Sequence, residues 1–329
     1  MVKIAFWDNG LGIRGTSVAL YDYAHYNEHI LKNQSIILYN KKNSSNDEYV
    51  VKKFSDRFQL YGVDHWSDVD NILFNEQCDI LYVIKSGDSD QYGYQVGDIV
   101  GQVSKIRKTV VHCVFNCNRP HGDVYASISP MVENARGFPV VPHMINLPDI
   151  KTDMREKLNI PINSIVFGRH GGYEQFDIEY VQKTVFKVAK ENPNIYFLFV
   201  NTKPFCENLP NIIHHDKIVD LEEKVKYINT CDAMLWARSD GETFGLSIGE
   251  FSMKNKPVFV TETGQLAHKL ILKNKAIWYS ENTLYDLLTS FDKHRIFQMD
   301  WQAYAEFTPE KVMEQFDKIF IQNNNEYSK

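Results

Sequence analysis

Two glutamates, Glu242 and Glu250, lie about two helical turns apart around a short glycine-containing segment. That segment, Thr243-Phe244-Gly245-Leu246, lies where an apolar, strand-like run gives way to a run of helical period, so a helix should begin there. The first amides of a helix have no partner within it and favour an anion such as a diphosphate. We therefore expect Glu242 at the mouth of an anion site and Glu250 within reach of ribose hydroxyls. The alternative is an acid that only stabilises the helix dipole, with a second acid on the surface.

A second candidate is the loop Gly10-Leu11-Gly12-Ile13-Arg14-Gly15, which matches the G-x-G-x-x-G pattern of dinucleotide sites. That pattern needs an acid after the second strand to hold ribose hydroxyls, but the run 35–39 is followed by Asn40-Lys41-Lys42. NAD is therefore not expected, whereas the lysines suit the ribose phosphate of NADP. Two other interpretations stay open: a tight turn that lets a helix approach a strand, and a loop whose Gly12 and Gly15 face a substrate.

A metal site is a weaker alternative. Cys113 and Cys117, with His112 beside them, are spaced like part of a metal site, but two further ligands are not evident. The five cysteines are odd in number and mostly lie in apolar runs, which favours reduced, buried thiols. We therefore expect no metal.

Short β-branched runs alternate with longer segments of helical period, the pattern of βα units around parallel sheets. The two prolines of the segment 141–148 interrupt this alternation. At 329 residues the chain is longer than one hydrophobic core usually grows. The sequence therefore predicts two α/β domains, 1–146 and 147–307. The expected strands are 3–7, 35–39, 80–84, 109–115, 124–128, 139–141, 164–168, 195–201, 233–237 and 257–261, and the expected helices are 16–31, 178–191, 221–230, 244–253 and 264–272.

Polar residues follow three strands of the second half, at Gly168-Arg169, Asn201-Thr202 and Arg238-Ser239-Asp240. Because parallel strands end at the same edge of a sheet, these residues should converge on one crevice. The last stretch of helical period, about 308–322, carries an apolar face that needs a core to cover it. We expect this helix to cross back to the first domain.

Composition narrows the classes of function. Apolar residues make up 43% and charged residues 24% of the chain, which is a globular composition. A net charge of -6 argues against a nucleic-acid partner, because such binding needs a basic face. No run is long and apolar enough for a membrane span or a secretory signal, so we expect a soluble, cytoplasmic protein. Peripheral contact with a membrane through surface side chains stays open.

Five short segments of the second half occur in an order and at a spacing typical of one family. They are Ile165-Val166-Phe167-Gly168-Arg169, Cys231-Asp232-Ala233-Met234-Leu235-Trp236-Ala237-Arg238, Glu242-Thr243-Phe244-Gly245-Leu246, Glu250-Phe251-Ser252 and Lys256-Pro257-Val258. With these segments the chain resembles the retaining GT-B glycosyltransferases of the family-4 type, whose signature is an E-x7-E motif in this setting. The resemblance is strongest over 165–261 and only general before it.

The resemblance implies two Rossmann-like domains that face each other across a cleft. It implies a hexosyl- or pentosyltransferase of glycan biosynthesis that moves a sugar from a UDP- or GDP-sugar to a hydroxyl of a saccharide or glycoconjugate. Domain 147–307 would bind this nucleotide-sugar donor, and domain 1–146 with the C-terminal helix would bind the acceptor. The transfer would retain the anomeric configuration without a metal or another cofactor, the leaving diphosphate taking the proton of the acceptor.

Site roles follow from the same resemblance. Arg169 would meet the donor phosphates, Glu242 the hydroxyls of the sugar, and Glu250 the ribose. His112 would bond the sugar from the first domain, although a lone histidine on a strand is also a common structural residue. The expected catalytic residues are Glu242, Arg169 and His112, and the expected donor-binding residues are Gly12, Gly15, Gly168, Arg238, Thr243, Phe244, Gly245, Leu246 and Glu250. Residues that follow strand ends of the first domain would shape the acceptor side: Lys85, Ser86, Asp88, His121 and Asp123.

The chain departs from the family at one charge. The family pairs its Gly-Arg arginine with a lysine about five residues on, but the segment 170–175 contains none and has Glu174 near that position. Arg238 is our candidate for the missing charge, because a guanidinium forks onto phosphate; the alternative is a surface arginine paired with Asp240. Two further functions stay open, an NADP-dependent oxidoreductase and a noncatalytic module that binds a sugar nucleotide.

Overall fold

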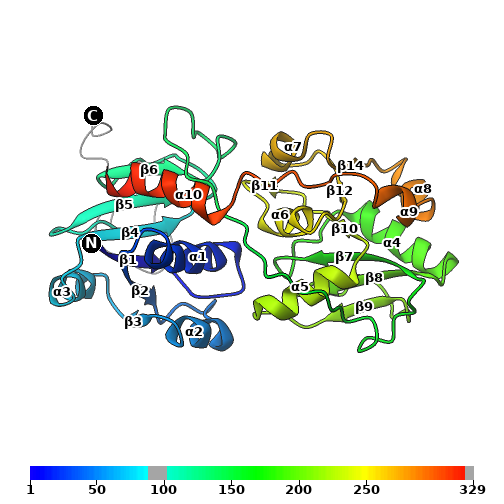
Figure 1. Cartoon of the computed structure of the whole chain (residues 1–329), viewed down its shortest axis with the longest axis horizontal. Helices are drawn as coiled ribbons and strands as arrows, with labels where there is room; N and C mark the ends of the chain where they lie inside the picture. The colour runs from blue at the N-terminus through cyan, green and yellow to red at the C-terminus, as the bar shows by residue number, and fades with distance from the viewer. Residues whose placement is uncertain (88–101, 323–329) are drawn as a thin grey trace. The chain divides into compact units, whose positions relative to one another are not determined.

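The computed structural model describes residues 1–87 and 102–322, and in this part the chain forms two α/β units (Figure 1). The first unit is Met1–Met144 with the C-terminal segment from Phe307, and the second is Ile145–Glu306. Each contains one six-stranded sheet whose paired strands are all parallel. The predicted α/β class is therefore confirmed. Asp88 lies outside the described residues.

The sheet of the first unit has the order β3-β2-β1-β4-β5-β6, the order of dinucleotide-binding folds. Its central strand reads KIAFWD and is buried from Ile4 to Asp8, because helices cover both faces of a parallel sheet. The strands are β1 (Lys3–Asp8), β2 (Gln34–Asn40), β3 (Gln59–Val63), β4 (Ile80–Lys85), β5 (Lys108–Cys113) and β6 (Val124–Ser127). The helices are α1 (Gly15–His29), α2 (Glu48–Ser55), α3 (Ser67–Asn75), α10 (Pro309–Phe316) and the wider-turned η1 (Asp317–Ile321).

The C-terminal helix belongs to the first unit, as predicted (red in Figure 1). Phe316 is fully buried, and its ring centroid lies 5.4 Å from that of Tyr23 and 5.5 Å from that of Tyr82. The apolar face of α10 thus covers the core between α1 and β4. The helix is not uniform, because it widens into η1 at Asp317.

The sheet of the second unit has the order β14-β12-β10-β7-β8-β9. Its core contains the aromatic rings of β7 and β8, including Phe167 and Phe197 at 5.6 Å. The strands are β7 (Ile165–His170), β8 (Ile195–Val200), β9 (Ile212–His215), β10 (Ala233–Leu235), β12 (Val258–Val260) and β14 (Ile277–Trp278), with β11 (Gly241–Glu242) and β13 (Gln265–Leu266) as a separate pair. The helices are α4 (Glu179–Glu191), α5 (Leu221–Thr230), α6 (Leu246–Met253), α7 (Ala267–Leu272), α8 (Leu284–Thr289) and α9 (Lys293–Ile296).

One predicted strand, 139–141, is wrong. Only a single bridge joins Val140 to Ser127, because Pro139 and Pro142 cannot donate backbone hydrogen bonds to a ladder. Several short elements were not predicted: β3, β9, β14, α2, α3, α8 and α9.

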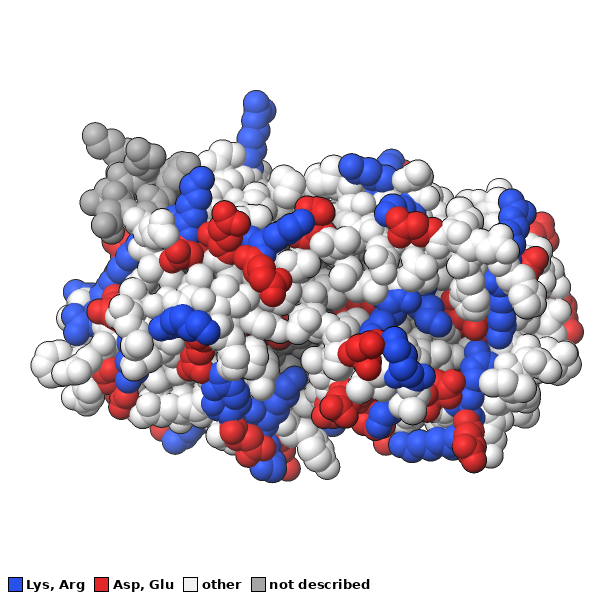
Figure 2. Space-filling view, viewed as in Figure 1, with Lys and Arg blue, Asp and Glu red and all other residues white. Residues whose placement is uncertain are grey.

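The surface is charged with both signs. On the face shown in Figure 2, lysine and arginine side chains alternate with aspartate and glutamate over each unit, without a continuous basic patch. Among the described helices, none combines the length and the apolar character that crossing a membrane requires.

Candidate functional site

Three neighbouring strands bring the predicted polar residues to one edge of the second sheet. β7 ends in Arg169 and His170, which pair in register with Phe199 and Val200 of β8. β10 pairs with the other side of β7 and leads to Arg238. The parallel order of these strands therefore gathers the side chains that the sequence separates, as predicted.

Arg169 is a buried cation that contacts only neutral groups. It is 4% exposed, and its guanidinium donates to the Thr202 hydroxyl at 2.6 Å and to the carbonyls of Gly172 and Asn201 at 2.8 and 3.3 Å. No carboxylate of the described residues lies within 4.0 Å of it. Burial lowers the pKa of Arg169 to about 10, so the group stays charged at neutral pH. A buried charge without a close partner is costly, and an anionic ligand would supply the missing partner.

Glu242 lies beside this cation. Its Oε1 accepts from the Trp236 indole at 2.9 Å, and its Oε2 lies 3.4 Å from an amino group of Arg238. Burial raises the pKa of the Glu242 carboxyl, and Arg238 and Trp236 oppose this shift. The carboxylate thus has one hydrogen bond of good length and one long ion pair, which leaves acceptor capacity for another donor.

Two glycines set the position of Glu242. Gly241 and Gly264 have φ angles of +71° and +57°, which side chains rarely allow. A Cβ atom on Gly241 would lie 2.2 Å from the carbonyl oxygen of Gln265, and one on Gly264 would meet the backbone of Asp240 at 1.9 Å. The two loops therefore cross at contact distance, and β11 pairs with β13 to place Glu242 opposite Leu266.

Glu250 is held by two side chains that the sequence reading did not assign to the site. It is 5% exposed on α6, with Lys224 Nζ of α5 at 2.8 Å from Oε1 and His170 Nε2 of β7 at 3.0 Å from Oε2. Burial would raise the pKa of this carboxyl, but Lys224 and His170 outweigh it and hold the pKa at about 2. Glu250 is an anion in a buried ion pair and not the surface acid of the alternative interpretation.

Charge accumulates at this edge of the sheet. The cations Arg169, Arg238 and Lys224 lie near three carboxylates, those of Glu242, Glu250 and Asp240. Of these cations, Arg169 has no ion pair within the described residues, so an anionic ligand would complete its surroundings.

Arg238 pairs with Asp240, as the alternative interpretation predicted, and also with Glu242, which was not predicted as its partner. It lies 3.7 Å from Asp240, which is 78% exposed, and 3.4 Å from Glu242. Its own side chain is only 15% exposed, so it is not the surface arginine of the alternative interpretation. Its buried Nε has no hydrogen-bond partner among the described residues, which leaves donor capacity for a ligand.

The segment between the two glutamates is mostly packing. Phe244 is 2% exposed, its ring meets Tyr304 edge to face at 5.5 Å, and its carbonyl accepts from the Tyr304 hydroxyl at 2.7 Å. Gly245 precedes α6 with φ +85°, while Thr243 and Leu246 are half-buried. The predicted start of a helix in this segment is confirmed, and Gly245 is needed for the turn into α6.

Gly168 is explained by packing. A Cβ atom there would lie 2.3 Å from Cys231 Sγ and 2.9 Å from the Tyr227 hydroxyl. The glycine therefore lets the end of α5 approach β7, which carries Arg169 and His170 in its last two positions. No ligand is required to account for it.

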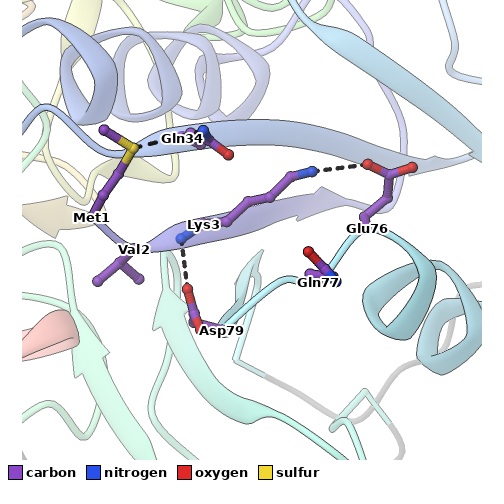
Figure 3. Close-up of a pocket in the computed structure, with 7 residues that line it drawn as sticks. All are labelled: Met1, Val2, Lys3, Gln34, Glu76, Gln77 and Asp79. Atoms are coloured by element: carbon purple, nitrogen blue, oxygen red, sulfur yellow. Dashed lines mark hydrogen bonds and ion pairs between the residues drawn. The ribbon is translucent and has the colours of Figure 1, made fainter.

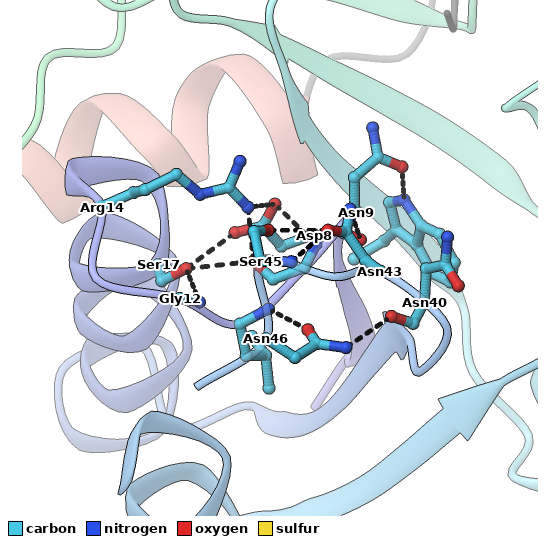
Figure 4. Close-up of polar contacts among 12 residues, drawn as sticks. Asp8, Asn9, Gly12, Arg14, Ser17, Asn40, Asn43, Ser45 and Asn46 are labelled. Atoms are coloured by element: carbon cyan, nitrogen blue, oxygen red, sulfur yellow. Dashed lines mark hydrogen bonds and ion pairs between the residues drawn. The ribbon is translucent and has the colours of Figure 1, made fainter. Parts of the chain in front are cut away.

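The glycine loop of the first unit is covered by its own chain (Figure 4). A Cβ atom on Gly12 would lie 2.3 Å from the Ser45 carbonyl oxygen, and one on Gly10 would lie 2.9 Å from Ser45 Oγ. The buried Asp8 accepts from the Ser17 hydroxyl at 3.1 Å, and the amide of Gly12 donates to that hydroxyl at 3.1 Å. These contacts explain Gly10 and Gly12 by the close approach of the loop that carries Ser45.

Gly15 and Arg14 occupy the start of α1. Gly15 is its exposed first residue, and Arg14 donates to the carbonyl of Gly10 at 2.8 Å. Burial raises the pKa of Asp8, and Arg14, at 4.0 Å, lowers it.

His112 lies inside the first unit with 0% exposure. Its Nε2 lies 2.8 Å from the Val141 carbonyl, which can only accept, so Nε2 carries the proton and Nδ1 accepts from the Tyr82 hydroxyl at 2.7 Å. Burial lowers its pKa to about 3, so the ring is neutral. Both nitrogens are engaged in the core, and in this arrangement His112 cannot bond a sugar; the structural interpretation fits it.

The expected acceptor-side residues lie at the strand ends of the first unit. Lys85 ends β4 with Nζ 3.2 Å from Nε2 of His121, and Asp123 accepts from the amide of Thr109 at 2.7 Å. The Ser86 carbonyl accepts from the backbone.

No cluster of three or more metal-ligating side chains occurs within residues 1–87 and 102–322. Cys113 and Cys117 are both buried free thiols.

A pocket of about 230 Å³ opens at the end of the first sheet where β1 and β2 begin (Figure 3). Met1, Lys3, Gln34, Glu76 and Asp79 line it, and Lys3 bonds both acids, through Nζ to Glu76 and through its amide to Asp79. It lies at the amino ends of β1 and β2, away from the edge where ligands of open α/β sheets bind. We assign it no role.

Comparisons with known proteins place the fold. No protein-family model matches the chain, and no curated protein matches its sequence. Anabaena HepE, solved in complex with UDP and glucose, has a TM-score of 0.72 at 13% identity over 98% of this chain and 100% of that chain. A glycosyltransferase from Rickettsia africae has a TM-score of 0.67 at 13% identity, covering 98% and 99% of the two chains. WaaG, a glycosyltransferase of lipopolysaccharide biosynthesis, has 0.62 at 12% identity, covering 97% and 100%. The chain has the GT-B fold.

Proposed function

We propose that this protein is a glycosyltransferase that moves a sugar from a nucleoside-diphosphate donor to a hydroxyl acceptor. The observation that carries the proposal is Arg169, a buried guanidinium without a carboxylate in contact among the described residues, at the ligand-binding edge of a GT-B sheet. A diphosphate is the anion that completes such a site, because a guanidinium binds phosphate oxygens in a fork.

The second unit holds the donor in this proposal. Arg169 and Arg238 bind the diphosphate, Glu242 accepts from hydroxyls of the sugar, and Glu250 accepts from the ribose. The absence of an ion pair for Arg169 among the described residues and the free acceptor capacity of Glu242 support these roles. The first unit with the C-terminal helix holds the acceptor, a saccharide or glycoconjugate.

The proposed transfer proceeds with retention. The acceptor oxygen forms a bond to the anomeric carbon on the face that the diphosphate leaves, the carbon–phosphate-oxygen bond breaks, and the acceptor proton passes to the leaving diphosphate. Arg169 and Arg238 would stabilise the charge that develops on that diphosphate, which is usually the largest catalytic contribution. No metal enters this scheme, and the E-x7-E arrangement of Glu242 and Glu250 is its basis in the sequence.

Calorimetric titration with UDP and GDP tests donor binding. UDP comes first, because HepE was solved with UDP and with UDP-glucose. Replacing Arg169 by Met removes charge-assisted hydrogen bonds of about 1.5–3 kcal/mol, so we expect nucleotide affinity to fall about 10- to 150-fold. The melting temperature without ligand should change little, because the lost hydrogen bonds are offset by removal of a buried charge.

A matched control is Arg295→Met, which removes an exposed arginine of the same unit and should leave affinity unchanged. Unaltered affinity in Arg169→Met would refute the phosphate site. Transfer assays with UDP- and GDP-sugars then separate an enzyme from a noncatalytic binding module: if nucleotide binds and no sugar is transferred or hydrolysed, the module is correct. The oxidoreductase is disfavoured, because the chain itself fills the approach to Gly12.

A further inference from the structure

Glu250 is clamped from two separate elements. Lys224 projects from α5 and is 13% exposed, and His170 ends β7 and is also 13% exposed. The helix that carries Lys224 is itself fixed, because Asp220 caps it and Val225, Tyr227 and Ile228 are buried. The His170 ring packs against Phe251 and Tyr227. The carboxylate therefore has little freedom to turn.

The two oxygens of Glu250 are not equivalent. Oε1 accepts a hydrogen bond from Lys224 at 2.8 Å. Oε2 and Nε2 of His170 lie 3.0 Å apart, but their geometry is not that of a hydrogen bond, and each of these buried atoms has no hydrogen-bond partner among the described residues. A buried acceptor without a donor is uncommon and costs about 1–3 kcal/mol. One oxygen is thus anchored, and the other is a buried acceptor whose hydrogen-bonding capacity is unused within the described residues.

We propose that Lys224 and His170 are positioning residues that hold Glu250 for one ribose hydroxyl, and so make the site select ribonucleotides over deoxyribonucleotides. This inference rests on the proposed function of the site. A ribose hydroxyl can donate to Oε2 and accept from Nε2–H of His170 at once, which satisfies both atoms. Lys224 keeps Oε1 in place. Because the carboxylate is planar, this also fixes the direction in which Oε2 accepts from the ribose hydroxyl.

Lys224 is a basic side chain beside His170 and Glu250, and the resembled family has a lysine that the segment 170–175 of this chain lacks. The sequence offers no base in 170–175, and the structure brings one from α5, more than fifty residues after β7 begins. Lys224 pairs with the carboxylate of Glu250. It therefore holds Glu250 and does not replace the lysine with which the family binds phosphate.

The test compares nucleoside diphosphates that differ by one hydroxyl. UDP, 2′-deoxy-UDP and 3′-deoxy-UDP, or the guanosine series if GDP binds the wild type, are titrated by calorimetry. We expect the wild type to bind one deoxy form about 10- to 150-fold more weakly than the ribonucleotide, the value of a hydrogen bond to a charged group. Lys224→Met and His170→Phe should reduce this ratio to below about 3-fold, within the range of a neutral hydrogen bond.

Conservative variants separate positioning from folding. Lys224→Arg keeps the cation and His170→Gln keeps a donor, so both should restore most of the ratio. Lys226→Met is the matched control, because Lys226 lies on the same helix and pairs with Glu223 at 2.6 Å. A purely structural role would weaken ribo- and deoxyribonucleotides alike and leave the ratio unchanged.

Failure of the proposed function and failure of this inference give different results in these titrations. If no nucleoside diphosphate binds the wild type, the proposed function fails. If the wild type prefers the ribonucleotide and Lys224→Met and His170→Phe keep that preference, this inference fails while the proposed function stands.

Discussion

The ionisation of Glu250 is the clearest case in which single residues decide the state of the site. A carboxyl group buried to 5% exposure would normally favour its neutral form. Here Lys224 and His170 reverse that tendency and lower the pKa from 4.5 to about 2. Glu242 shows the opposite balance, because burial raises its pKa despite Arg238. Two glutamates of one motif thus receive different environments.

The depressed pKa of Glu250 predicts that the difference in stability between the wild type and Glu250→Gln depends on pH. The folded-state pKa of Glu250 is depressed, so its carboxylate stabilises the fold above pH 4.5, and this contribution is lost as the pH falls toward 2. The free energy of unfolding of the wild type should exceed that of Glu250→Gln by roughly 3 kcal/mol at pH 7. The gap should narrow below pH 4.5, as measured by urea unfolding at several pH values.

The control for that measurement is Glu222→Gln, an exposed acid of α5. The free energy of unfolding of Glu222→Gln should differ little from that of the wild type at every pH. A gap for Glu250→Gln that stays constant between pH 6 and 3 would show that the ion pair does not depress the pKa.

At the scale of elements, close packing of α5 on β7 brings Lys224 near His170 and Glu250. Gly168 permits this approach, since Cys231 Sγ and the Tyr227 hydroxyl occupy the space of a side chain. The crossing of β11 and β13 at Gly241 does the same for Glu242. Glycines of this site therefore act by letting elements meet.

Gly168→Ala tests that conclusion. Overpacking should destabilise the protein by about 1–3 kcal/mol, measured by urea unfolding. Adding Cys231→Ala should recover part of the loss, because it removes the sulfur 2.3 Å from the new Cβ. Loss of nucleotide affinity with unchanged stability would instead favour the donor-binding role predicted from the sequence.

At the scale of the whole molecule, the chain returns to the first unit after completing the second. Phe316 of α10 is fully buried among aromatic rings of the first unit, such as Tyr23 and Tyr82. A unit built from distant parts of the chain depends on both of them for its core.

Phe316→Ala should therefore destabilise the first unit by about 3–5 kcal/mol, the usual cost of deleting a buried aromatic ring. Hydrogen exchange should show faster exchange in peptides from β1 and β4, and little change in peptides from β7 and β8. Phe297→Ala, at a 46% exposed site of the second unit, is the control and should alter neither. Equal loss of protection in both units would contradict a core confined to the first.

Much of the architecture was predictable from local pattern. Runs such as KIAFWD and IYFLFV are apolar without alternation, which identifies strands buried on both faces. Weakly patterned elements such as β3 and β9 were missed, because half-exposed residues carry little periodic signal.

The sequence by itself determined the two α/β units, the edge at which Arg169 and Arg238 meet, and the candidate pair Glu242 and Glu250. These depend on the alternation of strands and helices along the chain and on motifs within short segments, which local patterns encode. Only the tertiary structure decided that Lys224 and His170 hold Glu250 and that His112 lies inside the core. Those contacts join residues of different elements, and their distances depend on how α5 and α6 pack on the sheet. No spacing along the chain carries that information.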